Sequence, residues 1–217
     1  MHRIPLSNRA AATGAFAGMA TFPAVVAGLG ALRHDDYHPV RQAMSELALG
    51  RGGWLMTVAF CTMGVGTFLL ALALRRSAGA LVAPSLLALA GALDFVSAAF
   101  HTDPTGTATA TAHGRIHDAA GIATFLLFVA AIWVCAFSFR RSPRWRAFAA
   151  PTAAWAAAAV ATFFLIPALG DGRFGLAQRI FVATWLSWSL VVALRARRTA
   201  TEGSHRRAAS PLAAERT

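Results

Sequence analysis

Six long apolar segments constrain this chain more than any other feature. Each has about 20 residues, enough to cross the ~30 Å hydrocarbon core of a bilayer as an α-helix. None alternates polar and apolar residues with a period of two, which is the pattern of a membrane β-barrel. The segments are residues 10–32, 53–74, 79–100, 116–139, 148–169 and 174–194.

The composition agrees with the segments. The chain is 57% hydrophobic and only 13% charged, whereas a soluble domain carries about 25% charged residues. A disordered chain is excluded because it needs low hydrophobicity. We therefore predict an all-α, polytopic membrane protein whose domain, residues 10–198, is a bundle of six transmembrane helices. Residues 1–9 are expected to form an N-terminal arm, and residues 199–217 a disordered basic tail.

The arginine residues predict the orientation. All 20 basic residues are arginine, and 14 of them flank the segments on the side that carries both termini. Because basic residues are retained on the cytoplasmic side, both termini are expected in the cytoplasm. The alanine-rich, lysine-free composition is typical of a high-GC bacterial genome, so the expected location is the bacterial plasma membrane. The basic excess then indicates contact with membrane lipid, and no nucleic-acid partner is expected.

The first outer segment, residues 33–54, predicts a short amphipathic helix on the outer face. Pro39 suits a first helical position, and Gly50 suits the end of a helix. Two interpretations remain open: an interfacial linker with solvated charges, or a helix that turns Glu46 into the mouth of the bundle. The predicted apolar face holds Val40, Ala43, Met44 and Leu47, and the polar face holds Arg41, Gln42, Ser45 and Glu46.

The second outer segment, residues 101–121, carries three histidines. His113 and His117 are four residues apart, a spacing that places two imidazoles on one face of a helix. Together with His101 they could supply the three protein ligands of a catalytic zinc site. The other interpretation is that these are exposed histidines on a loop.

Asp94 lies inside the third apolar segment. A charged side chain at that depth costs about 2.5–3.5 kcal/mol on insertion scales, so it should face the bundle interior or a wet cavity. Ser97 and His101 follow on the same helical stripe, and Arg179 could reach down to Asp94 or Asp118. Asp94 either holds helices together by hydrogen bonds or forms a proton or ligand site. Four threonines at similar depth could surround it: Thr62, Thr124, Thr162 and Thr184.

The chain resembles the bacterial and archaeal membrane family catalogued as domain of unknown function 998. The resemblance rests on Ser45, Glu46 and Gly50 in SELALG, on the following Gly53 and Trp54, and on Asp103 ahead of His117. It covers about residues 13–194. It implies a compact multi-helix membrane protein without an assigned reaction, and it draws attention to Glu46, Asp103 and His117.

Three functions remain open from the sequence. The first is a small-ligand or proton binding and permeation module with an outer-face pocket. The second is a zinc-dependent membrane hydrolase acting on a lipid-like or envelope substrate, and the third is a structural or partner-binding membrane protein with no assigned protein partner. The ligand or proton candidates are Asp94, Glu46, Asp103, His117, Ser45 and Arg179, and the metal candidates are His101, His113 and His117.

Overall fold

A computed structural model describes residues 6–209, with the side chains of residues 171 and 201–209 left out. Within this range the chain is all-helical, and six of its helices are long and apolar enough to span a membrane. The protein is therefore a multi-pass membrane protein, and all six predicted segments are confirmed. The helices are α1 (Asn8–Leu32), α2 (Trp54–Ala78), α3 (Val82–Ala99), α4 (Ala112–Arg141), α5 (Ala149–Leu169) and α6 (Phe174–Ala209).

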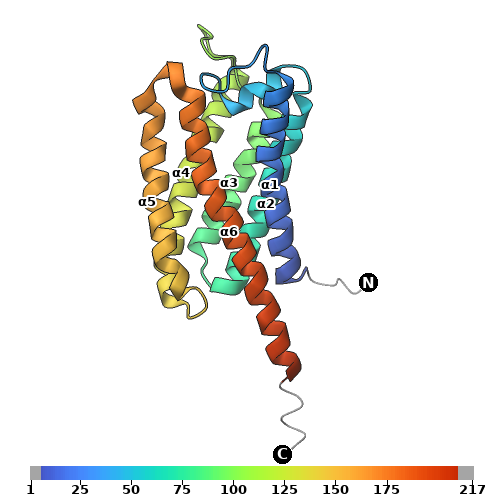
Figure 1. Ribbon diagram of the computed structural model, residues 1–217, viewed down its shortest axis with the longest axis vertical. Helices are drawn as coiled ribbons and strands as arrows, with labels where there is room; N and C mark the ends of the chain where they lie inside the picture. Colours follow the sequence, from blue (N-terminus) through green and yellow to red (C-terminus); the bar gives the residue numbers. More distant parts are fainter. Residues whose placement is uncertain (1–5, 210–217) are drawn as a thin grey trace, which may run out of the picture.

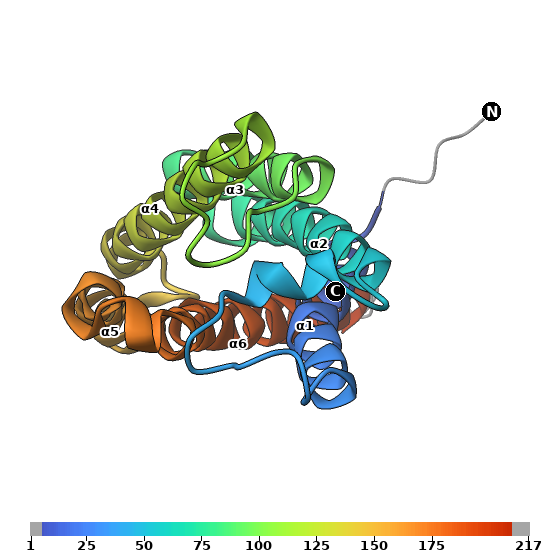
Figure 2. The same ribbon diagram turned by 90° about the horizontal axis from the view of Figure 1, so that it is seen from above.

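The helices stand side by side in chain order around a ring (Figures 1 and 2). Each packs against the helix that follows it, and α6 closes the ring by packing against α1. Short connections join α2 to α3, α4 to α5 and α5 to α6, whereas longer segments join α1 to α2 and α3 to α4. Two of these connections contain a single 3-10 turn each, η2 (Arg146–Phe148) between α4 and α5 and η3 (Asp171–Arg173) between α5 and α6.

The two halves of the ring pack by different means. Between α1 and α2, a methyl group added to Gly18 would lie 2.6 Å from the carbonyl oxygen of Thr62, and between α2 and α3 one added to Gly64 would lie 2.8 Å from that of Gly91. These backbones therefore touch directly, as small residues allow in membranes. The α4–α6 half packs through rings instead, with the Phe128 and Trp185 centroids 3.9 Å apart.

The last helix is longer than the sequence predicts. Helix α6 continues to Ala209, so the predicted disorder from Thr199 onward is wrong for residues 199–209. Arginine, alanine and glutamate are good helix formers and extend the helix beyond its apolar part. Residues 210–217, the rest of the predicted tail, lie outside the described residues, as do residues 1–5 of the predicted arm.

The end of the bundle opposite to both termini, which we call the outer end, is covered by a 3-10 helix, η1 (Met44–Leu49), which lies over the middle of the ring (Figure 2). The predicted short helix between α1 and α2 is present, but it is a 3-10 helix that begins at Met44 and not an α-helix that begins at Pro39. The carbonyl groups of Val40 and Arg41 accept hydrogen bonds from the first N–H groups of α6, at Leu176 and Gly175. These carbonyl groups are used for contact with α6 and not for the i to i+4 bonds of an α-helix.

Candidate functional site

A small cavity with a few polar groups in a mostly apolar wall lies inside the ring, directly beneath η1. Its volume is about 60 Å³, which is room for a few water molecules. Five of the six long helices line the cavity, together with η1. These helices are α1, α2, α3, α4 and α6. The lining residues are Phe22, Met44, Ser45, Phe60, Met63, Asp94, Ser97, His117, Gly121, Thr124, Phe125, Gln178, Val182 and Trp185.

Asp94 is the acidic group of this cavity. Its side chain is buried, and its Oδ2 atom has no hydrogen-bond partner among the residues that the structure describes. Ser97, one helical turn further along α3, lines the same cavity. The prediction that these two residues share an inward stripe is therefore confirmed, whereas the third member of that stripe, His101, does not line the cavity.

Two more buried polar atoms at the cavity lack partners within the described part of the chain. They are Oγ1 of Thr124 and Nε1 of Trp185. Leaving a buried donor or acceptor unsatisfied costs about 1–3 kcal/mol. Because both residues face the same small space as Asp94, water or another polar guest inside it would recover much of that cost.

His117 supplies an imidazole to the cavity wall. The residue is buried, and its Nδ1 atom lies 2.8 Å from the carbonyl oxygen of Phe100. A carbonyl oxygen can only accept, so Nδ1 carries a proton and Nε2 is the acceptor of the neutral ring. The Phe60 ring packs against the imidazole at a centroid distance of 5.8 Å. This fixes the orientation of the ring.

The roof of the cavity is held by a residue that the sequence analysis did not select. The Oε1 atom of Gln178 on α6 accepts a hydrogen bond of 2.9 Å from the backbone N–H of Met44. Both residues line the cavity, as does Ser45, one of the predicted candidates. The available signal was a polar amide in the first turn of an otherwise apolar span.

Glu46 is buried but does not line the cavity. Its carboxylate accepts hydrogen bonds from Ala43 N at 2.9 Å, Gln42 Nε2 at 3.1 Å, and Thr105 N and Oγ1 at 3.0 and 2.5 Å. The solvated-linker interpretation is therefore wrong for this residue. Glu46 joins the first outer segment to the second, and we call its bonds to Thr105 the Glu46 latch.

Asp103 also serves the outer loops. Its two carboxylate oxygens accept from the backbone N–H and the hydroxyl group of Thr111, at 2.7 and 2.8 Å. Thr111 in turn caps α4 by accepting from Gly114 N. The Asp103 carboxylate packs so closely against Gly114 that a methyl group there would collide with it. Asp103 thus fixes the loop ahead of α4 outside the cavity.

Arg179 binds the first outer segment and not a carboxylate. Its Nη1 atom donates to the carbonyl oxygens of Pro39, Gln42 and Gly175 at 2.6, 3.2 and 3.0 Å. Its Nη2 atom donates to the hydroxyl group of Tyr37. The prediction that Arg179 reaches Asp94 or Asp118 is therefore wrong. Burial raises the pKa of Tyr37, with Arg179 acting in the opposite direction.

The three metal candidates do not converge. His113 is exposed and packs on the Phe100 ring at a centroid distance of 5.2 Å, while exposed His101 lies 3.5 Å from the Thr57 hydroxyl group. His117 binds a carbonyl group, as described above. Across the described residues, no group of three His, Cys, Asp or Glu side chains is placed to hold a metal ion. The predicted zinc set is therefore not brought together.

The predicted hydroxyl layer is reduced to one threonine. Thr124 lines the cavity, while Thr62, Thr162 and Thr184 donate to carbonyl groups of their own helices. Such local bonds use the hydroxyl donor of a threonine in an apolar helix, and none of these three residues lines the cavity.

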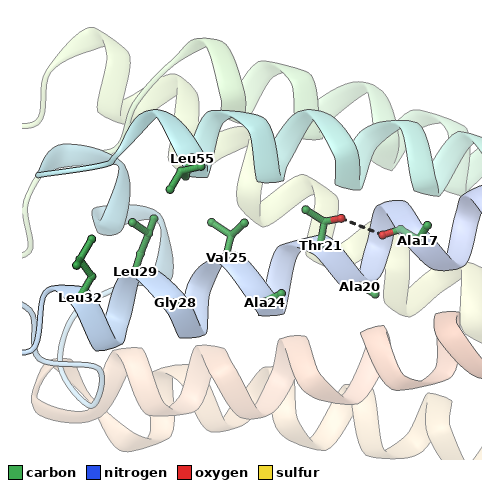
Figure 3. A pocket seen from close by; sticks show the side chains of 9 residues that line it. All are labelled: Ala17, Ala20, Thr21, Ala24, Val25, Gly28, Leu29, Leu32 and Leu55. Carbon is green, nitrogen blue, oxygen red and sulfur yellow. Dashed lines mark hydrogen bonds between the residues drawn. The ribbon is translucent and has the colours of Figure 1, made fainter.

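A larger hollow on the outside of α1 differs in chemistry from the buried cavity. It measures about 660 Å³ and lies along α1 near the start of α2, at Leu55 (Figure 3). Its lining is apolar apart from Thr21, whose hydroxyl group donates to the carbonyl oxygen of Ala17 (Figure 3). In a membrane-spanning bundle, such a surface suits lipid chains.

Comparison with known proteins supports the resemblance seen in the sequence. A family model described as "Protein of unknown function (DUF998)" matches residues 15–195. No curated protein and no solved structure matches the chain. Since the match spans the whole helical ring from α1 to α6, this multi-pass membrane protein belongs to the DUF998 family.

Proposed function

We propose that the protein is a proton binding and permeation module of the bacterial plasma membrane, with Asp94 as its proton-binding group. In this proposal both termini are cytoplasmic, and the cavity lies near the outer face. The observation that carries it is the set of three buried polar atoms without partners around one small space: Asp94 Oδ2, Thr124 Oγ1 and Trp185 Nε1.

The size of the cavity selects the kind of guest. A volume of about 60 Å³ admits a few water molecules and excludes most metabolites. Water inside it would connect the Asp94 carboxyl group with the hydroxyl groups of Ser97 and Thr124. Carboxyl groups within membranes commonly serve as proton relays.

His117 suits a role at the outer end of such a water chain. Its residue is held between Phe100 and Phe60, and its Nε2 atom remains an acceptor in the neutral ring. A proton entering from the outer side would pass to cavity water and then to the Asp94 carboxylate, which becomes a carboxylic acid. Release of that proton to water on the cytoplasmic side restores the carboxylate and completes the transfer.

The zinc-hydrolase alternative receives no support from the site geometry, because the three candidate imidazoles lie apart. The structural alternative differs from the proposal in one respect. It requires the polar groups around the cavity to satisfy each other, whereas Asp94, Thr124 and Trp185 each keep an unpaired atom within the described residues.

Proton flux into vesicles tests the proposal. The full chain is reconstituted into liposomes with an interior pH dye, and a potassium gradient with valinomycin sets the membrane potential. We expect the wild-type protein to acidify the lumen faster than protein-free vesicles. Asp94→Asn should abolish the difference, since an amide of the same shape cannot take up the proton.

Asp118→Asn is the matched control. Asp118 is an exposed carboxylate on α4 that does not line the cavity, so its loss should leave the flux unchanged. Thermal unfolding of all three proteins checks the fold. Equal flux in wild type and folded Asp94→Asn, or no wild-type flux above the lipid background, would refute the proposal.

A further inference from the structure

A second hollow lies at the opposite end of the bundle, where the α4–α5 turn meets α6. Its volume is about 530 Å³, and it shares no lining residue with the Asp94 cavity. Three of its seven lining residues are arginines. The lining consists of Arg144, Phe148, Val191, Leu194, Arg195, Arg198 and Thr199, and we call it the arginine hollow.

Arg195 is held in a fixed orientation at this hollow. Its guanidinium carbon lies 5.5 Å from the centroid of the Trp145 ring and 5.3 Å from that of Phe148. Its Nη2 atom donates a hydrogen bond of 2.9 Å to the carbonyl oxygen of Arg144. A guanidinium oriented in this way loses little conformational entropy when it binds an anion.

The other two arginines, Arg144 and Arg198, have side chains that are available to bind a guest. Arg144 and Arg198 are exposed, and their side chains form no hydrogen bond or ion pair with the described part of the chain. None of the lining residues is acidic. Three positive charges around one hollow favour an anionic guest, and guanidinium groups match phosphate oxygens especially well.

The hollow also has an apolar wall. Val191 and Leu194 on α6 and Phe148 at the end of η2 stand beside the arginines. Helix α6 runs past the ends of the other helices at this end (Figure 1). The charged part of the hollow is thereby placed beyond the apolar part along the same helix, which is the order of headgroup and acyl chain in a phospholipid.

We propose that the arginine hollow is a binding site for an anionic phospholipid. The phosphate group would contact Arg144 and Arg198, with Arg195 beneath it, and the first part of an acyl chain would lie along Val191 and Leu194. Basic pockets between transmembrane helices bind anionic headgroups in this manner. The apolar wall distinguishes a lipid from free phosphate. This site is independent of the proposed proton function.

Native mass spectrometry of the delipidated full chain in detergent tests the site. The protein is titrated with phosphatidylglycerol, with phosphatidylcholine of the same acyl chains, and with inorganic phosphate. We expect saturable binding of phosphatidylglycerol and weaker binding of phosphatidylcholine. Arg144→Gln combined with Arg198→Gln should raise the Kd for phosphatidylglycerol by roughly 10–30-fold. Each arginine near a lipid surface changes the Kd by about fivefold.

Arg141→Gln combined with Arg146→Gln is the control, because it removes the same charge from exposed residues of the same turn that do not line the hollow. It should change the affinity by less than about twofold. Equal weakening by both double variants would overturn the proposal in favour of diffuse charge. Equal binding of the two lipids, or displacement of phosphatidylglycerol by inorganic phosphate, would also overturn it. Arg198→Gln alone, on an exposed helical surface, serves if the double variant does not fold.

Discussion

The outer layer and the cavity beneath it treat their polar side chains in opposite ways. In the outer layer, Glu46, Asp103 and Arg179 each make at least two hydrogen bonds to neighbouring loop or helix groups. In the cavity, Asp94 and Thr124 keep buried atoms without partners in the described structure. The comparison teaches that the charged residues of the outer loops hold those loops together. The polar atoms that lack hydrogen-bond partners, and that could therefore bind a guest, lie at the cavity beneath.

The Glu46 latch offers the strongest test of this contrast. Glu46→Ala leaves four donors without their acceptor, two of them on Thr105. We expect the free energy of unfolding to fall by roughly 2–4 kcal/mol, because hydrogen bonds to charged groups contribute about 1.5–3 kcal/mol each and the exposed donors regain water. Denaturant titration in detergent measures the loss. Glu46→Gln should lose less of the free energy of unfolding. A loss below about 1 kcal/mol for Glu46→Ala would mean that Glu46 does not hold the two outer segments together.

Arg179→Met tests the next largest effect. It removes the donors to Pro39, Gln42 and Tyr37 while keeping a flexible apolar side chain of similar length. We expect a loss of about 2 kcal/mol, with the first outer segment held to α6 only by its remaining backbone and Gln178 hydrogen bonds. Hydrogen exchange of residues 37–43 should rise in the same variant. Arg173→Met, at an exposed site in η3, is the control and should have little effect on either measurement.

Asp103→Ala should have a smaller effect, since both of its bonds go to one exposed residue, Thr111. We expect about 1 kcal/mol of destabilisation. The matched Asp118→Ala variant should change stability by less than about 0.5 kcal/mol, because surface substitutions away from such contacts usually do. Unfolding curves of the two variants give the comparison directly. Equal losses would mean that Asp103 carries no special role in its loop.

The smallest expected effect depends on pH and involves the end of α1. Arg33 lies 2.8 Å from the exposed carboxylate of Asp36, and its hydrogen bond lowers the pKa of that carboxyl group. A lowered pKa means that the pair stabilises the fold above the usual pKa of an aspartate, and that this contribution disappears as the pH falls through the lowered value. The unfolding midpoints of wild type and Asp36→Asn should therefore differ slightly at neutral pH and converge in acid. A difference that persists in acid would contradict this assignment.

Much of the fold follows from the sequence because length and apolar composition alone decide which segments can span a membrane. The inward position of Asp94 could be predicted for a related reason, since an acidic side chain in lipid has to face inward. The hydrogen-bond partners of Glu46 and Arg179 could not be predicted from the sequence. Glu46 binds Thr105, 59 residues away, and Arg179 binds carbonyl groups more than 130 residues away. Helical periodicity carries no information about such contacts.

The type of the outer helix was missed for a related reason. Local pattern predicted an α-helix from Pro39, but Val40 and Arg41 direct their carbonyl groups to the N-terminus of α6. The tail was missed in the other direction, because its composition was taken as disorder and its helix-forming residues extend α6 to Ala209. In both places α6 decides the structure: the first outer segment is bound to its N-terminus, and the tail continues it.

The direct backbone contact at Gly18 and Gly64 has a mechanical consequence. Where two main chains touch, no side chain can change rotamer between them, so we expect α1, α2 and α3 to move together at these contacts. Any widening of the space around Asp94 must then arise on the opposite wall, where rings such as Phe128 and Trp185 can slide over one another. We expect any such motion to be hinged where this group of helices meets the rest of the ring, at α1–α6 and α3–α4.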